Sequence, residues 1–193
     1  MAVFGDRISA GYGASSLDRA YANVLGSMLI YGVDNRAVGG SIIAQQLRDQ
    51  ILPYTQPVEL AVFLTGYNDM RIGTPIATYA NLLEQALAHL VSRANKILIG
   101  NCLFMTAAGY AAYGPQLNHG SDQRVAEMNQ VIAQLCGTYR CSLADLSQSY
   151  QPAIHTSADL VHPNDTGHAV IAEAFEAAFN RSTLWLPLVA TKA

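Results

Sequence analysis

The segment 58–69 reads VELAVFLTGYND, an almost wholly apolar run that meets a polar turn. A short apolar run bounded by turn signals is typical of a strand that is buried on both faces of a sheet. Residues 58–64 are therefore predicted to form a central strand. In parallel sheets covered by helices on both faces, ligands bind beyond the carboxyl ends of the strands. The polar residues 65–69 are thus predicted to lie at a ligand-binding edge.

The rest of the chain alternates between short apolar runs and longer stretches with helical periodicity. Strands are predicted at 2–4, 33–38, 58–64, 96–102 and 140–146. Helices are predicted at 17–30, 41–52, 74–94, 121–139 and 164–179, with Thr74 and then Asn164 or Asp165 as N-caps and Pro75 at a first helical position. Parallel strands need crossover connections, so this alternation predicts an α/β fold in which a five-stranded parallel sheet lies between two helical layers.

Length and composition indicate one folded domain over residues 1–193, since 51% of the residues are hydrophobic and only 13% are charged. The net charge of −3 and the lack of a basic block argue against nucleic acid as a partner. No apolar run approaches the roughly 18 residues that a membrane span needs. The chain opens almost directly on a strand, without a signal peptide, which favours a cytoplasmic protein or a domain cut from a longer one.

The chain has three cysteines, Cys102, Cys136 and Cys141, and an odd count is not a disulfide framework. Free and mostly buried thiols are expected, with pairing of Cys136 and Cys141 as the alternative for an exported protein. The spacing of these cysteines does not fit a zinc site. We therefore expect neither a metal nor a cofactor.

Four polar or glycine-rich segments adjoin the predicted strands and the last helix. Gly5-Asp6-Arg7 follows the first strand, Gly39-Gly40 the second and Thr65–Asp69 the third, and Asp159–Asp165 precedes the last helix. Because the carboxyl ends of parallel strands meet at one edge of a sheet, all four segments are expected to face one rim.

Together these segments resemble the conserved blocks of the SGNH hydrolases, also called the GDSL esterase/lipase family. The family's first block usually reads Gly-Asp-Ser with a glycine a few residues later. This chain has GDRISAG, with Gly11 in place and Arg7 where the family carries its nucleophilic serine. The second block, NRAVGG, matches best when Gly40 is the oxyanion-hole glycine.

The remaining two blocks match the family fully. GYND contains Gly66, Asn68 and Asp69, and DLVHP contains Asp159, His162 and Pro163. The resemblance spans residues 5 to 163 and implies a flavodoxin-like SGNH hydrolase fold. It also implies ester hydrolysis, with carbohydrate esters or short acyl esters as the substrate class.

Ester hydrolysis needs a base, a group that orients the base, and donors for the oxyanion. His162 is the candidate base, because an imidazole with a pKa of about 6.5 takes and returns a proton near neutral pH. Asp159, three residues earlier, is expected to orient the imidazole. Asn68 and Gly40 are expected to donate to the oxyanion, while Asp69 supports the loop. With Arg7, these residues form the predicted catalytic site.

Arg7 leaves several interpretations open. In one, the chain is an inactive binding module for glycan or acyl ligands, and Arg7 pairs with Asp159 or another carboxylate. In a second, His162 activates water for weak hydrolysis without an acyl-enzyme, and the permanently charged Arg7 stabilises the oxyanion or holds an anionic substrate. In a third, Ser9 is the nucleophile. If a helix has begun there, however, the step of two residues from position 7 to Ser9 rotates the side chain by about 200°, away from His162. The fourth is an introduced, inactivating substitution.

The expected ligand is a small-molecule ester or an acetylated carbohydrate. Tyr110 and Tyr113 in the loop at 103–120 would stack on sugar rings, line an acyl groove or simply pack within the loop. The apolar tail at 182–193 is expected to pack on its own domain or on a second subunit, which would make a homo-oligomer. Surface or packing roles are expected for the other histidines, His89, His119, His155 and His168.

Overall fold

A computed structural model describes residues 1–183 of the protein, so the predicted contacts of the tail at 184–193 lie outside the described residues. Its centre is a parallel sheet with the strand order β2-β1-β3-β4-β5. The strands are β1 (Ala2–Gly5), β2 (Asp34–Asn35), β3 (Val58–Leu64), β4 (Ala94–Gly100) and β5 (Ser142–Ala144). This order is that of flavodoxin-like sheets, in which β1 and β3 are the neighbours at the point where the order reverses.

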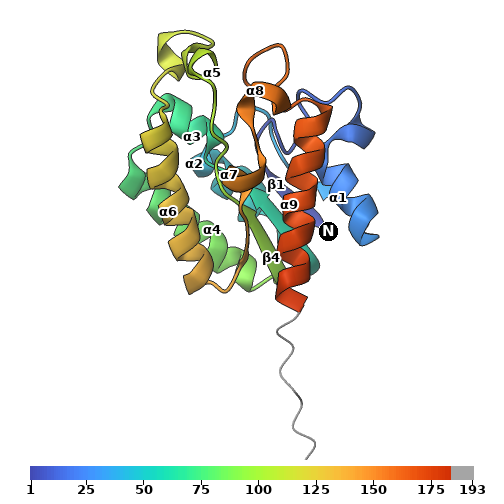
Figure 1. The fold of residues 1–193 in the computed structure, drawn as a ribbon. Coiled ribbons are helices and arrows are strands. Elements are labelled where there is room, and N and C mark those ends of the chain that lie inside the picture. Colours follow the sequence, from blue (N-terminus) through green and yellow to red (C-terminus); the bar gives the residue numbers. More distant parts are fainter. Residues whose placement is uncertain (184–193) are drawn as a thin grey trace, which may run out of the picture.

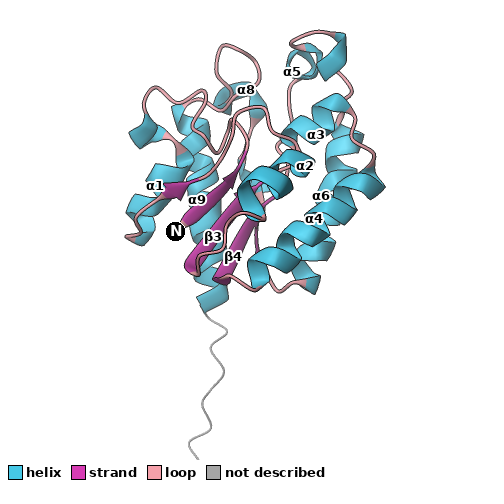
Figure 2. Cartoon of the chain, turned by 180° about the vertical axis from the view of Figure 1, so that it is seen from behind, coloured by secondary structure: helices cyan, strands magenta, loops and turns pink. Residues whose placement is uncertain are grey.

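Helices cover both faces of the sheet, which confirms the predicted three-layer architecture. Helices α1 (Tyr21–Leu29) and α9 (Asp165–Thr183) pack together on one face. Helices α4 (Ile76–Val91) and α6 (Asp122–Thr138) lie on the other face with α2 (Ile43–Gln45) and the π-helical turn η2 (Gln46–Ile51). Figure 2 shows this second layer from its own side.

The core forms where the apolar strands meet the helices. The predicted central strand β3 is fully buried from Leu60 to Phe63. On the α1 side, the rings of Tyr21 and Phe175 stack at 5.5 Å and join α1 to α9. Within residues 1–183, no helix has the length and apolarity that crossing a membrane requires.

Several predicted boundaries were wrong on the α1 side of the chain. The strand predicted at 33–38 is only Asp34–Asn35. The helix predicted at 17–30 is split into a 3-10 turn, η1 (Leu17–Arg19), and α1, because Ala20 is extended with ψ 137°. Helix α1 ends at Leu29 and not at Gly32, because the next residue, Ile30, adopts a left-handed conformation with φ 57°.

Other differences lie around β3 and α4. The polar segment after β3 is not a loop, because Tyr67 already begins helix α3 (Tyr67–Ile72). Thr74 does not cap α4: its hydroxyl donates to Asp69 Oδ1 at 2.9 Å, and Pro75 precedes the helix in an extended conformation. At the last helix the predicted cap is found, since Asn164 Oδ1 accepts from the Gly167 N–H at 2.9 Å.

Short elements also form where none was predicted. The segment 103–120 contains α5 (Ala107–Ala111) and the 3-10 turn η3 (Pro115–Leu117). Between β5 and α9 lie α7 (Leu146–Ser149) and α8 (Pro152–His155). Figure 1 shows α5 and α8 at the same end of the molecule, beyond the carboxyl ends of the strands.

Candidate active site

The loop after β1 packs directly against the segment that carries His162. Gly13 has φ 90°, and a Cβ atom there would collide with the Pro163 carbonyl and with His162 Cβ. The Tyr12 ring lies 5.7 Å from the His162 ring, centroid to centroid. Two segments that lie about 150 residues apart in the chain therefore share one rim, as predicted.

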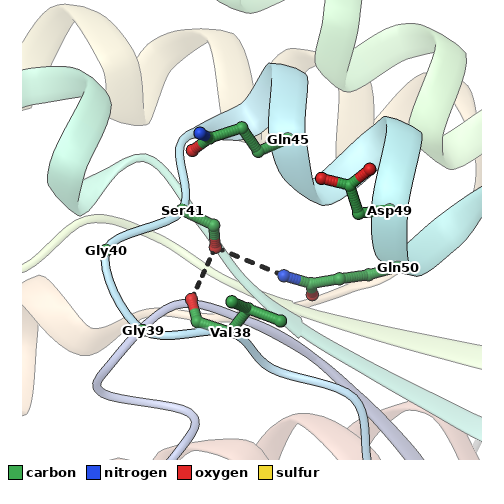
Figure 3. A pocket seen from close by; sticks show the side chains of 7 residues that line it. All are labelled: Val38, Gly39, Gly40, Ser41, Gln45, Asp49 and Gln50. Atoms are coloured by element: carbon green, nitrogen blue, oxygen red, sulfur yellow. Dashed lines mark hydrogen bonds between the residues drawn. The ribbon is translucent and has the colours of Figure 1, made fainter.

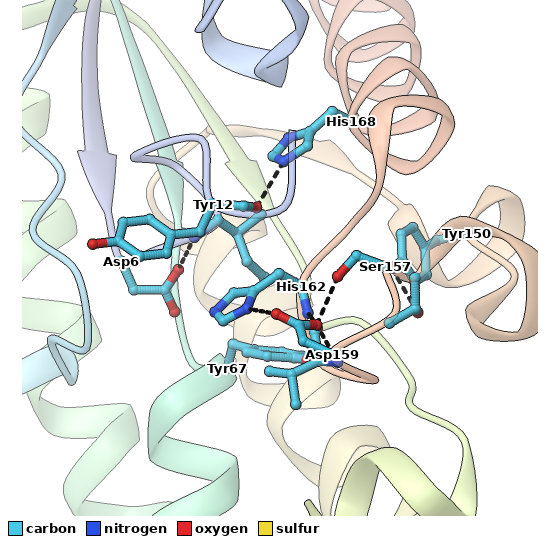
Figure 4. A network of polar contacts seen from close by, with 11 residues as sticks. Asp6, Tyr12, Tyr67, Tyr150, Ser157, Asp159, His162 and His168 are labelled. Atoms are coloured by element: carbon cyan, nitrogen blue, oxygen red, sulfur yellow. Dashed lines mark hydrogen bonds and ion pairs between the residues drawn. The ribbon is translucent and has the colours of Figure 1, made fainter. Parts of the chain in front are cut away.

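Asp159 and His162 form a hydrogen-bonded pair with separate tasks for the two carboxylate oxygens. Oδ2 lies 2.5 Å from His162 Nδ1. Oδ1 accepts from the Ser157 hydroxyl at 2.7 Å and from the N–H groups of Val161 and His162 at 2.9 Å each. Figure 4 shows this network. Oδ1 thus holds the carboxylate in place, while Oδ2 faces the imidazole.

The hydrogen bond to Asp159 orients the imidazole of His162 and leaves its other nitrogen free. Partial burial alone would raise the pKa of Asp159, but the hydrogen bonds from His162, Ser157 and Val161 together hold it well below its usual value. The ionised carboxylate keeps the proton on His162 Nδ1. Within the described part of the chain, Nε2 has no hydrogen-bond partner. It is therefore placed to accept a proton.

The loop of Gly39 and Gly40 offers a backbone donor. Gly40 adopts φ 81°, and among residues 1–183 its N–H has no hydrogen-bond partner. The neighbouring Ser41 hydroxyl fixes the loop by donating to the Val38 carbonyl at 2.8 Å and accepting from Gln50 Nε2 at 3.2 Å (Figure 3). An exposed N–H on a fixed loop is suited to an anionic oxygen.

The Asn68 amide points toward the first and second blocks. Its Nδ2 donates to Asp6 Oδ2 at 3.2 Å and to the Ser41 carbonyl at 3.1 Å. Both hydrogens of this nitrogen are therefore engaged. Asp69, in contrast, supports the loops, as expected, since it accepts from the Ile43 N–H at 2.8 Å and from Thr74.

Asp6 is a buried carboxyl that titrates near neutral pH. Complete burial raises its pKa to about 7, and the nearby Asp69 adds to this effect. The hydrogen bond from the Ile8 N–H, at 3.0 Å, and the charge of Arg7 act in the opposite direction. Ordinary sequence reasoning missed this group, because nothing in GDR distinguishes a buried aspartate from an exposed one.

The raised pKa of Asp6 predicts a pH-dependent stability. The folded pKa lies above the unfolded value, so the contribution of Asp6 is fully present below about pH 4 and is lost as the pH rises through about 7. The Asp6→Asn variant cannot ionise there. Between pH 5 and pH 8 its free energy of unfolding should fall by roughly 2 kcal/mol less than that of the wild type. Urea unfolding at both pH values measures this, and equal changes in the two proteins would contradict the assignment.

Arg7 lies against the Gly39–Gly40 loop. A Cβ atom at Gly39 would come within 3.1 Å of Arg7 Cγ, and one at Gly40 within 3.8 Å of an Arg7 guanidinium nitrogen. The guanidinium carbon also lies 5.6 Å from the centroid of the Tyr12 ring. In the described residues Arg7 has no ion pair, so the expected pairing with Asp159 is not found.

Ser9 does not lie at the site as a free nucleophile. It is fully buried, and its hydroxyl shares a 2.8 Å hydrogen bond with the Tyr21 hydroxyl. Ser9 therefore anchors the loop after β1 to helix α1. The chain does not form the regular helix at Ser9 that the sequence argument assumed, but the conclusion is the same.

His168 packs against the loop after β1 and contacts Tyr12, a residue that sequence reasoning did not identify. His168, buried on α9, contacts the Tyr12 carbonyl through Nε2 at 3.0 Å and accepts from the Tyr21 N–H through Nδ1 at 3.2 Å. Burial lowers the pKa of His168, which keeps it neutral for these contacts. The packing role expected for His168 is thus confirmed, and it holds Tyr12 beside His162.

The cysteines do not form disulfides in this structure. Cys102 and Cys136 are buried and Cys141 is partly exposed, and all three are free. The Cys136 thiol donates to the Cys141 carbonyl at 3.1 Å. Among residues 1–183, no group of three or more His, Cys, Asp or Glu side chains is arranged to hold a metal ion.

A comparison with protein families matches residues 3–170 to the GDSL-like Lipase/Acylhydrolase family. The chain belongs to this family. No curated protein matches the sequence. Solved structures match over nearly the whole chain: TesA, with a TM-score of 0.75 and 19% identity, covers 93% of this chain and 97% of its own.

Two other solved structures show the same relation. The esterase EstA from Pseudoalteromonas, solved with monoethylphosphonate as inhibitor, has a TM-score of 0.70 and 16% identity over 95% of this chain and 97% of its own. Axe2, an acetylxylan esterase from Geobacillus stearothermophilus, has a TM-score of 0.67 and 16% identity over 92% of each chain. At these identities the likeness shows the fold and leaves the chemistry to the residues of this chain.

Proposed function

We propose that this GDSL-family protein hydrolyses esters slowly, with water activated by His162 and with Arg7 at the position of the family's serine. The observation that supports this most is the position of the Arg7 side chain. The Arg7 side chain packs against Gly39 and Tyr12 and has no polar contact with His162 or Asn68. His162, which is paired with Asp159 through Nδ1, therefore keeps an unpartnered Nε2.

The proposed reaction has two steps, the attack of water on the ester and the breakdown of the tetrahedral intermediate. His162 Nε2 removes a proton from a water molecule as the water oxygen bonds to the ester carbon. The resulting oxyanion accepts from the Gly40 N–H and from the Asn68 amide, while Asp159 stabilises the imidazolium. The imidazolium then returns the proton to the leaving alkoxide as the ester C–O bond breaks. No acyl-enzyme forms, and the products are an acid and an alcohol.

Two features make this reaction slow. Water replaces a hydroxyl held by the protein, so the advantage of a fixed nucleophile is lost. The Asn68 amide must also loosen its bonds to Asp6 and Ser41 before it can donate to the oxyanion. Weak turnover, not the full rate of a serine esterase, is the expected behaviour.

Small acyl esters or acetylated carbohydrates are the proposed substrates. Support comes from the acetylxylan esterase among the similar structures and from Tyr113, whose side chain is exposed on the segment over the rim. Tyr113 is also a ring on which a sugar would stack, although the guanidinium of Arg71 already lies 5.3 Å from its centroid.

The test is the release of p-nitrophenol from p-nitrophenyl acetate. The wild type should exceed the buffer rate, and the His162→Ala variant should lose that excess, because general-base catalysis contributes typically 10²-fold or more. His119→Ala, which removes an exposed histidine, is the matched control and should keep the wild-type rate. An excess rate that survives in His162→Ala would reject the proposal.

The alternative is a non-catalytic binding module for glycan or acyl ligands. It is favoured by the lack of a hydroxyl at position 7 and by the full engagement of the Asn68 amide. This alternative predicts ligand binding without turnover, and equal p-nitrophenyl acetate rates for the wild type and His162→Ala. The same assay therefore separates the two functions.

A further inference from the structure

Arg7 carries a positive charge that nothing in the described chain neutralises. Its side chain is exposed at the rim and forms no ion pair within residues 1–183. Its neighbours there are Tyr12 and the backbone of Gly39 and Gly40, which carry no charge. Other arginines show the contrast: Arg36 is paired with Asp34 at 2.8 Å.

A second cation, Arg71 of helix α3, lies close enough to interact with Arg7. Arg71 is only 3% exposed and has no carboxylate partner in the described residues. One of its terminal nitrogens donates to the Ala112 carbonyl at 2.9 Å, but its Nε has no partner. Burial lowers the pKa of Arg71, and the charge of Arg7 contributes to this effect. Neither guanidinium therefore has an ion-pair partner among the described residues.

Three carboxylates of this region form no ion pair with either arginine, and Asp49, which lines the pocket beside Gly39 and Gly40, is paired with Arg48. Asp159 interacts with Arg71 only at a distance and is hydrogen-bonded to His162. Asp6 is completely buried, with its oxygens bonded to the Ile8 N–H and the Asn68 amide, and is largely protonated below neutral pH. The Arg7 guanidinium thus lies without an ion-pair partner in the described residues, beside an unpartnered N–H, that of Gly40.

We infer that the ester accepted here carries an anionic oxygen group, a carboxylate or a phosphate, which the Arg7 guanidinium binds next to Gly40. A guanidinium binds both groups with two parallel hydrogen bonds. The anion would place the ester carbonyl toward Gly40 and His162. This inference rests on the proposed active site and narrows its substrate class.

Equilibrium binding tests the inference without turnover. Isothermal titration or ligand-observed NMR compares monomethyl succinate, which has a free carboxylate, with dimethyl succinate, its neutral counterpart. The wild type should bind the charged ester about tenfold more tightly, and added salt should weaken this preference. In Arg7→Gln the two affinities should agree within about twofold. Arg36→Gln, which removes an exposed arginine already paired with Asp34, should keep the wild-type preference.

A third ligand, methyl phosphate, distinguishes the two sources of the anion. Tighter binding of monomethyl succinate would assign a carboxylate, and tighter binding of methyl phosphate would assign a phosphate, provided that Arg7→Gln removes the preference. Equal affinity for charged and neutral esters, or a preference that survives in Arg7→Gln, would overturn the inference. This experiment measures binding alone. If the protein prefers charged esters here but hydrolyses nothing in the p-nitrophenyl acetate assay, the proposed reaction is rejected and the inferred anion site is kept.

Discussion

Replacing Arg7 by serine is expected to raise the turnover of p-nitrophenyl acetate by at least about 100-fold. The substitution puts a hydroxyl at the position proposed for the family's nucleophile and removes a side chain that packs against Gly39 and Gly40. His162 Nε2, which has no partner in the described residues, can then take the hydroxyl proton. Covalent catalysis replaces attack by free water, and an early burst of p-nitrophenol should accompany the faster turnover.

The matched control for this gain is a second serine in the same loop. Ser9→Ala, added to Arg7→Ser, should leave the gain intact, because the Ser9 hydroxyl is buried against Tyr21. If Arg7→Ser folds normally and shows no gain, then His162, Asn68 and Gly40 do not form the site proposed for them.

The second large effect is expected from Asp159→Asn in the Arg7→Ser protein. Oδ1 of Asp159 accepts three hydrogen bonds, from Ser157, Val161 and His162, and an asparagine oxygen can keep all of them. The new amide nitrogen then faces His162 Nδ1 and donates to it. This forces the imidazole proton onto Nε2, where the base must be unprotonated. Turnover should fall by roughly 10³- to 10⁴-fold, as tautomer reversal does in serine proteases.

The kinetics of two variants separate this tautomer effect from a general loss of structure. Ser157→Ala removes one hydrogen bond to Oδ1 and leaves Oδ2 facing the imidazole, so its turnover should fall by less than about tenfold. If Asp159→Asn lowers turnover no more than Ser157→Ala does, Asp159 does not set the tautomer of His162.

The sequence predicted the parts of the fold that depend on strong local patterns. The run at 58–64 is apolar throughout, and it forms the buried strand β3 as expected. The pairing of Asp159 with His162 followed from their spacing before α9 and is present in the structure. Predictions from weak patterns were wrong. In the strand predicted at 33–38, only Asp34–Asn35 pairs with a neighbouring strand. That pairing depends on the position of β1 and not on the residues at 33–38 themselves.

The parts of the site that could not be predicted depend on long-range contacts. The side chain of Arg7 is placed by Tyr12 and by Gly39, which comes from another loop. The raised pKa of Asp6 comes from complete burial and from Asp69, which lies more than sixty residues away. Periodicity and spacing describe neighbours along the chain, so they carry no information on such contacts.

We propose that an assembled hydrolase site surrounds position 7 and that Arg7 replaces only its nucleophile. Labelling with an organophosphonate probe, followed by peptide mass spectrometry, tests this most directly. The wild type should remain unmodified, while Arg7→Ser should be labelled at position 7 and should lose the label when His162→Ala is added. A labelled wild-type serine such as Ser9, or a folded Arg7→Ser protein that takes no label, would contradict the account.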